Sequence, residues 1–180
     1  MSDRAPVTHT LAAYISTFTS ASLPDEVMAY TCKLAQDGIG VLCAATHKSV
    51  TAAQGIGDFA EEIAGPGPCT LIGRNRKVDP VSAALANGTL GYAADFEPHH
   101  PEAILHPIAV MLPTALALSE AQNRTGAEAL AAVALGCEVT YRVSMAMNPR
   151  ELYDRGFHPS AIAGSFGAAA ASAFLLGLDE

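Results

Sequence analysis

Apolar and polar positions alternate along this chain with the period of an α-helix. Between residues 8 and 19 the apolar side chains lie three or four positions apart: Leu11, Tyr14, Ile15 and Phe18. This spacing gathers them on one face of a helix. Comparable patterns predict further helices over residues 25–45, 49–64, 80–94, 107–121, 126–147 and 159–177. Two polar loops are expected, over residues 95–106 and 150–157.

Several of these helices carry their own boundary signals. Asp79 followed by Pro80 is a capping residue with a proline at the first helical position. Thr125 and Glu128 have the spacing of a capping box. The Gly-Pro-Gly-Pro run at 65–68 ends the helix before it.

The one convincing strand covers residues 69–73, and Lys77-Val78 is its expected partner. The predicted fold class is therefore all-α. We expect a single helical domain over residues 1–180, a mainly helical and alanine-rich bundle with at most a short β-hairpin near residues 69–78.

Composition supports this prediction. Half of the residues are hydrophobic, only 6% are aromatic and none is Trp. Alanine dominates the apolar fraction; it is the best helix former and allows helices to approach closely. Ser, Gly or Pro interrupts the longest apolar stretches before the roughly 18 residues that a membrane span needs. We therefore expect no membrane partner.

Charge and cysteine content exclude further classes of protein. Ten Lys and Arg against eighteen Asp and Glu give a net charge of −8, which argues against binding nucleic acid or an anionic membrane. Residues 1–10 lack the pattern of an export signal. We therefore expect a cytoplasmic protein with reduced thiols. The chain has four cysteines, Cys32, Cys43, Cys69 and Cys137, which lack zinc-site spacing. Three of the four lie in apolar surroundings, where burial is expected.

Histidines provide the strongest chemical signal. His99, His100 and His106 lie in one loop, and His158 precedes a later helix. Both His106 and His158 are followed by proline and then a helix, which predicts that each is an N-cap residue. Amides at a helix N-terminus suit carboxylates, and the helix dipole favours neutral imidazole. This combination suits proton abstraction next to a carboxylate.

Two other interpretations of the histidines stay open. Each His-Pro pair can simply cap a helix. The histidines together with Asp95, Glu97 and Glu102 could instead supply metal ligands. However, no pair with the spacing of a helical metal site fixes a geometry, so we predict no metal and no cofactor. A serine hydrolase is disfavoured because the Gly-x-Ser-x-Gly motif is absent.

Two blocks of the sequence resemble a known family. The first comprises Ala84-Leu85-Ala86-Asn87-Gly88, Ala94-Asp95-Phe96-Glu97, His100, His106-Pro107 and Leu112-Pro113-Thr114-Ala115-Leu116-Ala117. The second comprises Gly156-Phe157-His158-Pro159-Ser160 and Gly164-Ser165-Phe166-Gly167-Ala168-Ala169-Ala170. Both are similar to motifs of the MmgE/PrpD family, which includes 2-methylcitrate dehydratase, cis-aconitate decarboxylase and iminodisuccinate epimerase.

The resemblance implies a cofactor-free lyase or isomerase that acts on small di- or tricarboxylates. It implies a homodimer formed by the helical domain, with a smaller domain covering the site. By motif position, Asp95 matches the active-site aspartate of the family. His106 matches the histidine that moves a proton at the substrate carbon, and His158 matches the second active-site histidine.

A substrate with several carboxylates needs cationic or hydrogen-bonding partners. Near the motifs the chain offers His99, His100 and Arg155, which we take as substrate-binding candidates. His99 stands where the family commonly has a hydroxyl residue, and Ile108 stands where a small serine is common. Both departures alter the expected pocket.

Family members are much longer than this chain. We therefore expect residues 1–180 to form an incomplete N-terminal part of the helical domain, without the active-site lysine or the covering domain. The chain alone is then expected to have little activity. The alternative hypothesis is a non-catalytic helical interaction or dimerisation module in which the histidines only cap helices.

Overall fold

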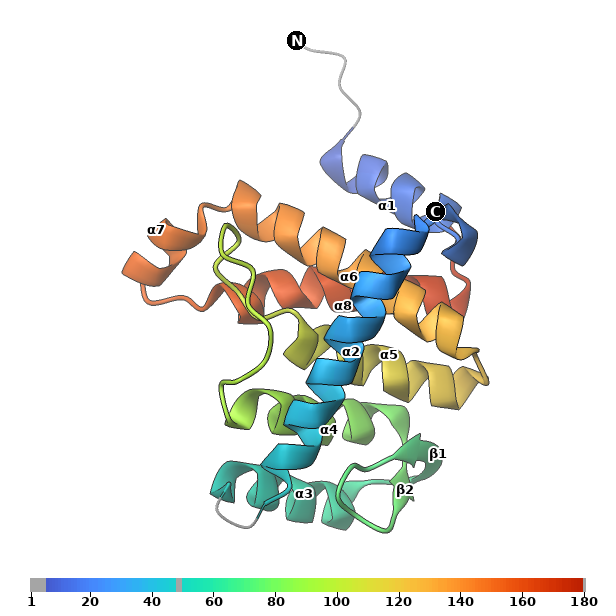
Figure 1. Cartoon of the computed structure of the whole chain (residues 1–180), viewed down its shortest axis with the longest axis vertical. Coiled ribbons are helices and arrows are strands. Elements are labelled where there is room, and N and C mark those ends of the chain that lie inside the picture. The colour runs from blue at the N-terminus through green and yellow to red at the C-terminus, as the bar shows by residue number, and fades with distance from the viewer. Residues whose placement is uncertain (1–5, 48–49, 180) are drawn as a thin grey trace.

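The computed structural model describes residues 6–47 and 50–179, and helices make up most of it (Figure 1). The helices are α1 (Val7–Thr17), α2 (Asp25–Ala45), α3 (Thr51–Ile63), α4 (Pro80–Ala93), α5 (Ile108–Gln122), α6 (Gly126–Ala146), α7 (Pro149–Asp154) and α8 (Pro159–Leu176). A 3₁₀ turn, η1 (Ser20–Ser22), precedes α2. Two strands, β1 (Pro66–Thr70) and β2 (Lys77–Val78), form an antiparallel pair. The predicted all-α class is confirmed.

Two elements differ from the prediction. The segment expected to be a polar loop over 150–157 contains α7, because Pro149 stands at a first helical position, where its fixed φ favours the helix. The strand β1 begins at Pro66 rather than at Cys69. Gly67 makes this possible, since a Cβ there would collide with the main-chain oxygen of Val78.

The predicted capping residues act as expected. The Asp79 carboxylate accepts hydrogen bonds from the main-chain nitrogens of Val81 and Ser82, both at 3.0 Å. These bonds, led by those from Ser82, lower the pKa of Asp79. Thr125 and Glu128 form the reciprocal capping box at the start of α6. The predicted start of α3 at residue 49 lies outside the described residues.

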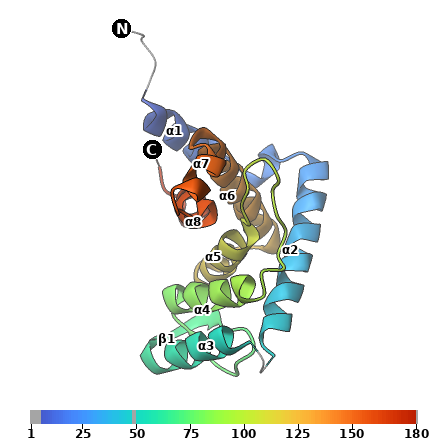
Figure 2. The same cartoon turned by 90° about the vertical axis from the view of Figure 1, so that its left-hand side faces the viewer.

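Helix α5 lies at the centre of the molecule. It packs against α4 on one side and against α6 and α8 on the other (Figure 1). The long helix α2 runs along one side of α4, α5 and α6 (Figure 2). The main core joins these helices through buried side chains that include Leu42, Leu90, Met111 and Val133.

Helices α6 and α8 make the most extensive helix–helix contact, and glycines permit it. A Cβ on Gly167 would collide with the main-chain oxygen of Gly136 and with the hydroxyl of Thr140. That hydroxyl donates to the Gly136 oxygen at 2.7 Å. The expected close packing through small residues is therefore present in this pair.

The same two helices are long and apolar enough to cross a membrane, judged by length and composition alone. The Ser and Gly residues in these helices therefore do not lower the mean hydropathy enough to exclude a membrane span, contrary to the prediction. About half of the most apolar window of each helix is buried inside the molecule, and helices in the cores of soluble proteins pass the same criterion. The absence of a membrane partner stays a prediction.

The cysteines follow the prediction only in part. Cys69 and Cys137 are buried, whereas Cys32 and Cys43 are exposed on the surface of α2. The expectation of three buried thiols is wrong because α2 contacts the molecule along one side only. The predicted lack of an export signal rests on residues 1–10, of which residues 1–5 lie outside the described part.

Candidate functional site

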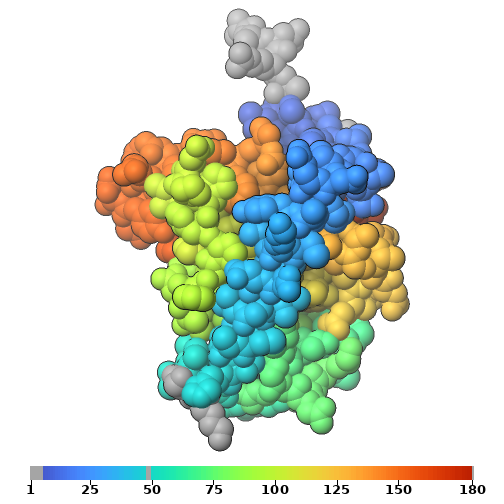
Figure 3. Space-filling model, viewed as in Figure 1, coloured from blue at the N-terminus to red at the C-terminus, as the bar shows by residue number. Residues whose placement is uncertain are grey.

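The site is built around the loop between α4 and α5. This loop, residues 95–106, lies on the surface between α7 and α2 (Figure 3). Buried Ala103 and Leu105 anchor it, and the Ser144 hydroxyl donates to the Ala103 oxygen at 2.8 Å. Ile104 has φ of +49°, which is uncommon for a β-branched residue. The buried side chains of Ala103 and Leu105, on either side of Ile104, hold the loop in this conformation.

His106 is held at both its main chain and its ring. Its main-chain nitrogen donates to the Ser160 hydroxyl at 3.1 Å, which ties the loop to α8. Its Nδ1 lies 3.0 Å from the main-chain oxygen of Glu97. A carbonyl oxygen only accepts, so Nδ1 carries the hydrogen and Nε2 is left for other chemistry.

The prediction that His106 is an N-cap residue is wrong. Helix α5 begins at Ile108, and Pro107 is its capping residue. Pro107 has φ of −75° and ψ of −30°, so it already follows the helical path, and its oxygen accepts from Met111. His106 is thereby displaced one residue outside the cap.

His158 is the N-cap residue of α8, as predicted, but its ring does not cap the helix. The main-chain oxygen of His158 accepts from the amides of Ala161 and Ile162. The ring Nε2 instead lies 2.8 Å from the Tyr92 hydroxyl and 3.4 Å from the Tyr153 hydroxyl. The imidazole is therefore oriented by phenols.

His106 and His158, far apart in the chain, line the same cavity of about 590 Å³. The Tyr92 ring lies close to both, with its centroid 6.5 Å from that of His106 and 5.7 Å from that of His158. The remaining wall is largely apolar and comes from α3, α4, α5 and α8. Among the residues that the structure describes, no Lys or Arg lines this cavity.

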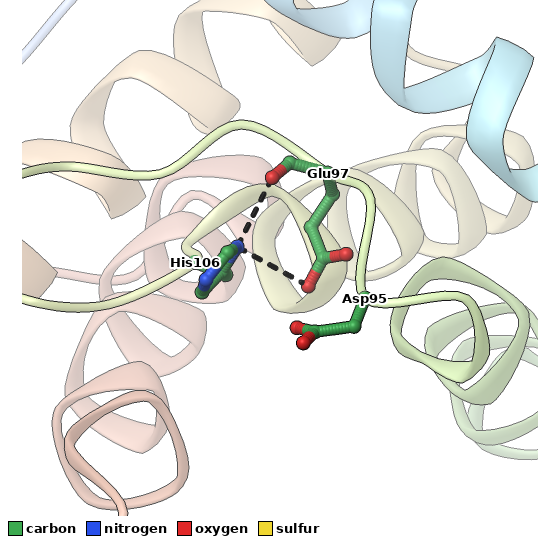
Figure 4. Close-up of side chains that lie close together, drawn as sticks. All are labelled: Asp95, Glu97 and His106. Atoms are coloured by element: carbon green, nitrogen blue, oxygen red, sulfur yellow. Dashed lines mark hydrogen bonds and ion pairs between the residues drawn. The ribbon is translucent and has the colours of Figure 1, made fainter.

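Glu97 is the most unusual group beside the cavity. Its side chain is 1% exposed, and neither carboxylate oxygen has a hydrogen-bond partner within the described structure. One oxygen, Oε1, lies 3.6 Å from Nδ1 of His106 (Figure 4). Burying a carboxylate without full pairing costs free energy. Such a cost at this position makes the loop a candidate functional segment.

Asp95 lies next to this pair. Its side chain is exposed, and it points toward Glu97 and His106 (Figure 4). Ligand atoms of the three residues lie within 4.8 Å of one another, so they could gather around a divalent cation. If Nδ1 of His106 were the ligand atom, it would first have to give up its hydrogen bond to the Glu97 oxygen. The predicted absence of a metal stays a prediction.

The three substrate-binding candidates lie in different places. The His99 ring lies beside the site, 5.0 Å from that of His106. The His100 ring packs 4.1 Å from Tyr141, outside the cavity lining. Arg155 is exposed and also outside the lining; its guanidinium lies 5.7 Å from the Phe157 ring.

Sequence reasoning did not select Tyr92 or Tyr153. Tyr92 stands on the last turn of α4, just before the Asp95 motif, and this proximity was the available signal. Partial burial raises the pKa of the Tyr92 phenol, and the charge of Asp95 raises it further. The phenol therefore keeps its proton and can donate a hydrogen bond.

Comparison with known proteins places this chain in a family. A family model for the MmgE/PrpD N-terminal domain matches residues 9–180. The chain belongs to the MmgE/PrpD family. This confirms the resemblance that the histidine motifs indicated.

Two fungal relatives in this family match almost the whole chain. The cis-aconitate decarboxylase-like protein oryM of Aspergillus oryzae (strain ATCC 42149 / RIB 40) is 34% identical over 181 residues, which cover 96% of this chain and 37% of oryM. A cis-aconitate decarboxylase of Aspergillus terreus is 29% identical over 180 residues, which cover 97% of this chain and 36% of that protein. The chain thus spans little more than a third of the length of these relatives.

A human cis-aconitate decarboxylase is 33% identical over a shorter stretch of 109 residues, which cover 58% of this chain and 22% of that protein. Relatives of this MmgE/PrpD chain that are named cis-aconitate decarboxylase therefore occur in both fungi and animals.

Proposed function

We propose that this chain forms the histidine-bearing part of a cofactor-free carboxy-lyase that acts on a small unsaturated di- or tricarboxylate such as cis-aconitate. The observation that carries this proposal is that His106 and His158 line one cavity, with Tyr92 close to both rings. The names of the relatives favour decarboxylation over dehydration of a 2-methylcitrate-like acid.

The chemistry requires a positioned proton donor. When a carboxylate leaves as CO₂ from a carbon next to a C=C bond, its bonding electrons form a new C=C bond. The π electrons of the original double bond move to its far carbon, and this carbon takes up a proton. Protonated His106 can supply this proton from Nε2, because Nδ1 is engaged with Glu97.

Recognition of the substrate carboxylates would begin at α8. Its first residues, including Ser160 and Ala161, line the cavity at the positive end of the helix dipole. His99 lies nearby as a further hydrogen-bonding group. A small carboxylate partner, a homodimer and a cytoplasmic location are part of the same proposal.

The alternative, a non-catalytic dimerisation module, draws on exposed apolar side chains such as Val81 and Phe96, which are 77% and 82% exposed. The histidine rings weigh against it. If the rings served only as helix caps, their nitrogens would contact helix amides. Instead, a ring nitrogen of His106 contacts the main-chain oxygen of Glu97. A ring nitrogen of His158 contacts the Tyr92 hydroxyl.

Turnover tests the proposal. The chain replaces the 180 matched residues of the Aspergillus terreus relative, and CO₂ release from cis-aconitate is measured. We expect release above background, and His106→Ala should lower it by about 10²–10⁴-fold, the usual contribution of an acid–base group. Glu102→Gln, an exposed change in the same loop, is the matched control. A folded chimaera without turnover, beside an active parent enzyme, would contradict the proposal.

A further inference from the structure

The Tyr92 hydroxyl occupies one of the two ring nitrogens of His158. It lies 2.8 Å from Nε2, within hydrogen-bond distance. Tyr92 itself lines the cavity, and its ring stands nearly perpendicular to both histidine rings. His158 lines the same cavity, and its Nε2 is hydrogen-bonded there to this phenol.

We propose that Tyr92 is a catalytic residue of this site and that His158 exchanges protons with the substrate through its hydroxyl. This inference rests on the proposed lyase function. In the transfer, the Tyr92 O–H bond breaks and its proton goes to the substrate carboxylate oxygen that gains negative charge as CO₂ leaves, whereas His106 protonates the carbon. In the same step the phenol oxygen takes the Nε2 proton of protonated His158, which becomes neutral.

The groups around Tyr92 suit this role. Asp95 and Glu97 approach it from the loop, Tyr153 from α7 and His158 from the start of α8. Burial and the two carboxylates disfavour a phenolate. A relay in which the phenol never carries a full negative charge avoids that cost, because the oxygen gains one proton as it loses the other.

Tyr153 provides a matched control. Its hydroxyl also approaches Nε2 of His158, but at 3.4 Å, and it does not line the cavity. A Tyr153→Phe change therefore removes a similar group from the same ring without removing a group that can reach the substrate.

The test begins with the 180-residue chain, labelled with ¹⁵N-histidine. NMR reports which ring nitrogen of His158 carries hydrogen and whether the other is hydrogen-bonded. Tyr92→Phe should change the Nε2 signal of His158, and Tyr153→Phe should leave it nearly unchanged. An unchanged Nε2 signal in a folded Tyr92→Phe variant would overturn the proposal without touching the role of His106.

The second part uses the active chimaera. Tyr92→Phe should lower kcat by on the order of 10²-fold, the low end for an acid–base group. His158→Ala combined with Tyr92→Phe should be no slower than the slower single variant, since groups that act as one unit are not additive. Independent, multiplicative losses would overturn the relay. A silent chimaera with the Tyr92–His158 contact intact would instead overturn the lyase function.

Discussion

Each histidine in the cavity is defined by what holds its ring. His106 donates from Nδ1 to the Glu97 main chain, which leaves Nε2 for proton transfer. His158 is held the other way round, with Nε2 against the Tyr92 hydroxyl. Two histidines that look alike in sequence, each followed by proline, therefore have different chemical roles.

Glu97→Gln should stabilise the isolated chain. The change removes a buried charge whose oxygens have no hydrogen-bond partner in the described structure. We expect the free energy of unfolding in urea to rise by about 1 kcal/mol, because a neutral amide costs less to bury than a carboxylate without hydrogen-bond partners. Glu102→Gln, on the exposed part of the loop, should change it by less than about 0.5 kcal/mol. A large loss of stability in Glu97→Gln would show that the carboxylate has a favourable partner.

The sequence could predict which histidines matter but not what holds them. The His-Pro pairs and family motifs point to His106 and His158. Tyr92 and Glu97 acquire their roles through contacts across the fold, and no periodicity marks them. Arg155 carried the right charge for a carboxylate, but α7 leaves it on the surface beside Phe157.

At the scale of elements, helices were predictable because their ends carry local signals. The Asp79 cap and the Thr125–Glu128 box act over three residues, so they can be read directly. Helix α7 was missed because six residues with several charges lack an apolar period. The start of β1 was missed because its Gly-Pro run also resembles a turn.

Helix packing predicts opposite effects at two glycines. Gly167→Ala should lower the free energy of unfolding by about 1–3 kcal/mol or more, because its Cβ would collide with the Gly136 backbone. Gly40→Ala in α2 should raise it by about 0.5–1 kcal/mol, since the space there is open and alanine favours a helix. Urea denaturation of both variants checks this. Equal effects would contradict the close approach of α6 and α8.

The Asp79 cap predicts a pH dependence. Its hydrogen bonds lower the pKa in the folded chain below the usual 3.8, so its contribution is present above that value and is lost as the pH falls below it. Asp79→Ala should cost about 1 kcal/mol near neutral pH. The difference between wild type and variant should shrink between about pH 5 and pH 2. A constant difference over this range would show that the charge of Asp79 is irrelevant to the cap.

At the scale of the whole molecule, the chain presents apolar surface that its own helices leave uncovered. An apolar groove of about 800 Å³ lies between α1 and α6, lined by residues that include Val7, Leu11 and Tyr14. Uncovered apolar surface of this kind favours association. Because relatives extend well beyond the matched region, the same chain is expected to have little turnover alone, without further groups to exclude water.

Self-association is the matching prediction. Sedimentation velocity should show a sedimentation coefficient that rises with concentration up to about 100 μM, as expected for a contact of modest affinity. Tyr14→Ser, which makes one side of the groove polar, should weaken this rise. A constant monomer for both proteins would contradict an interaction role for this surface.

The central claim is that His106 and His158 serve one substrate site. Its most direct test is a titration of the 180-residue chain with cis-aconitate, followed through the ring proton signals of both histidines. We expect the two signals to shift along a single saturation curve, in the millimolar range typical of weak binding. Both shifts should also disappear in a folded His106→Ala, His158→Ala variant. Signals that follow different curves, or that do not move at all, would contradict the claim.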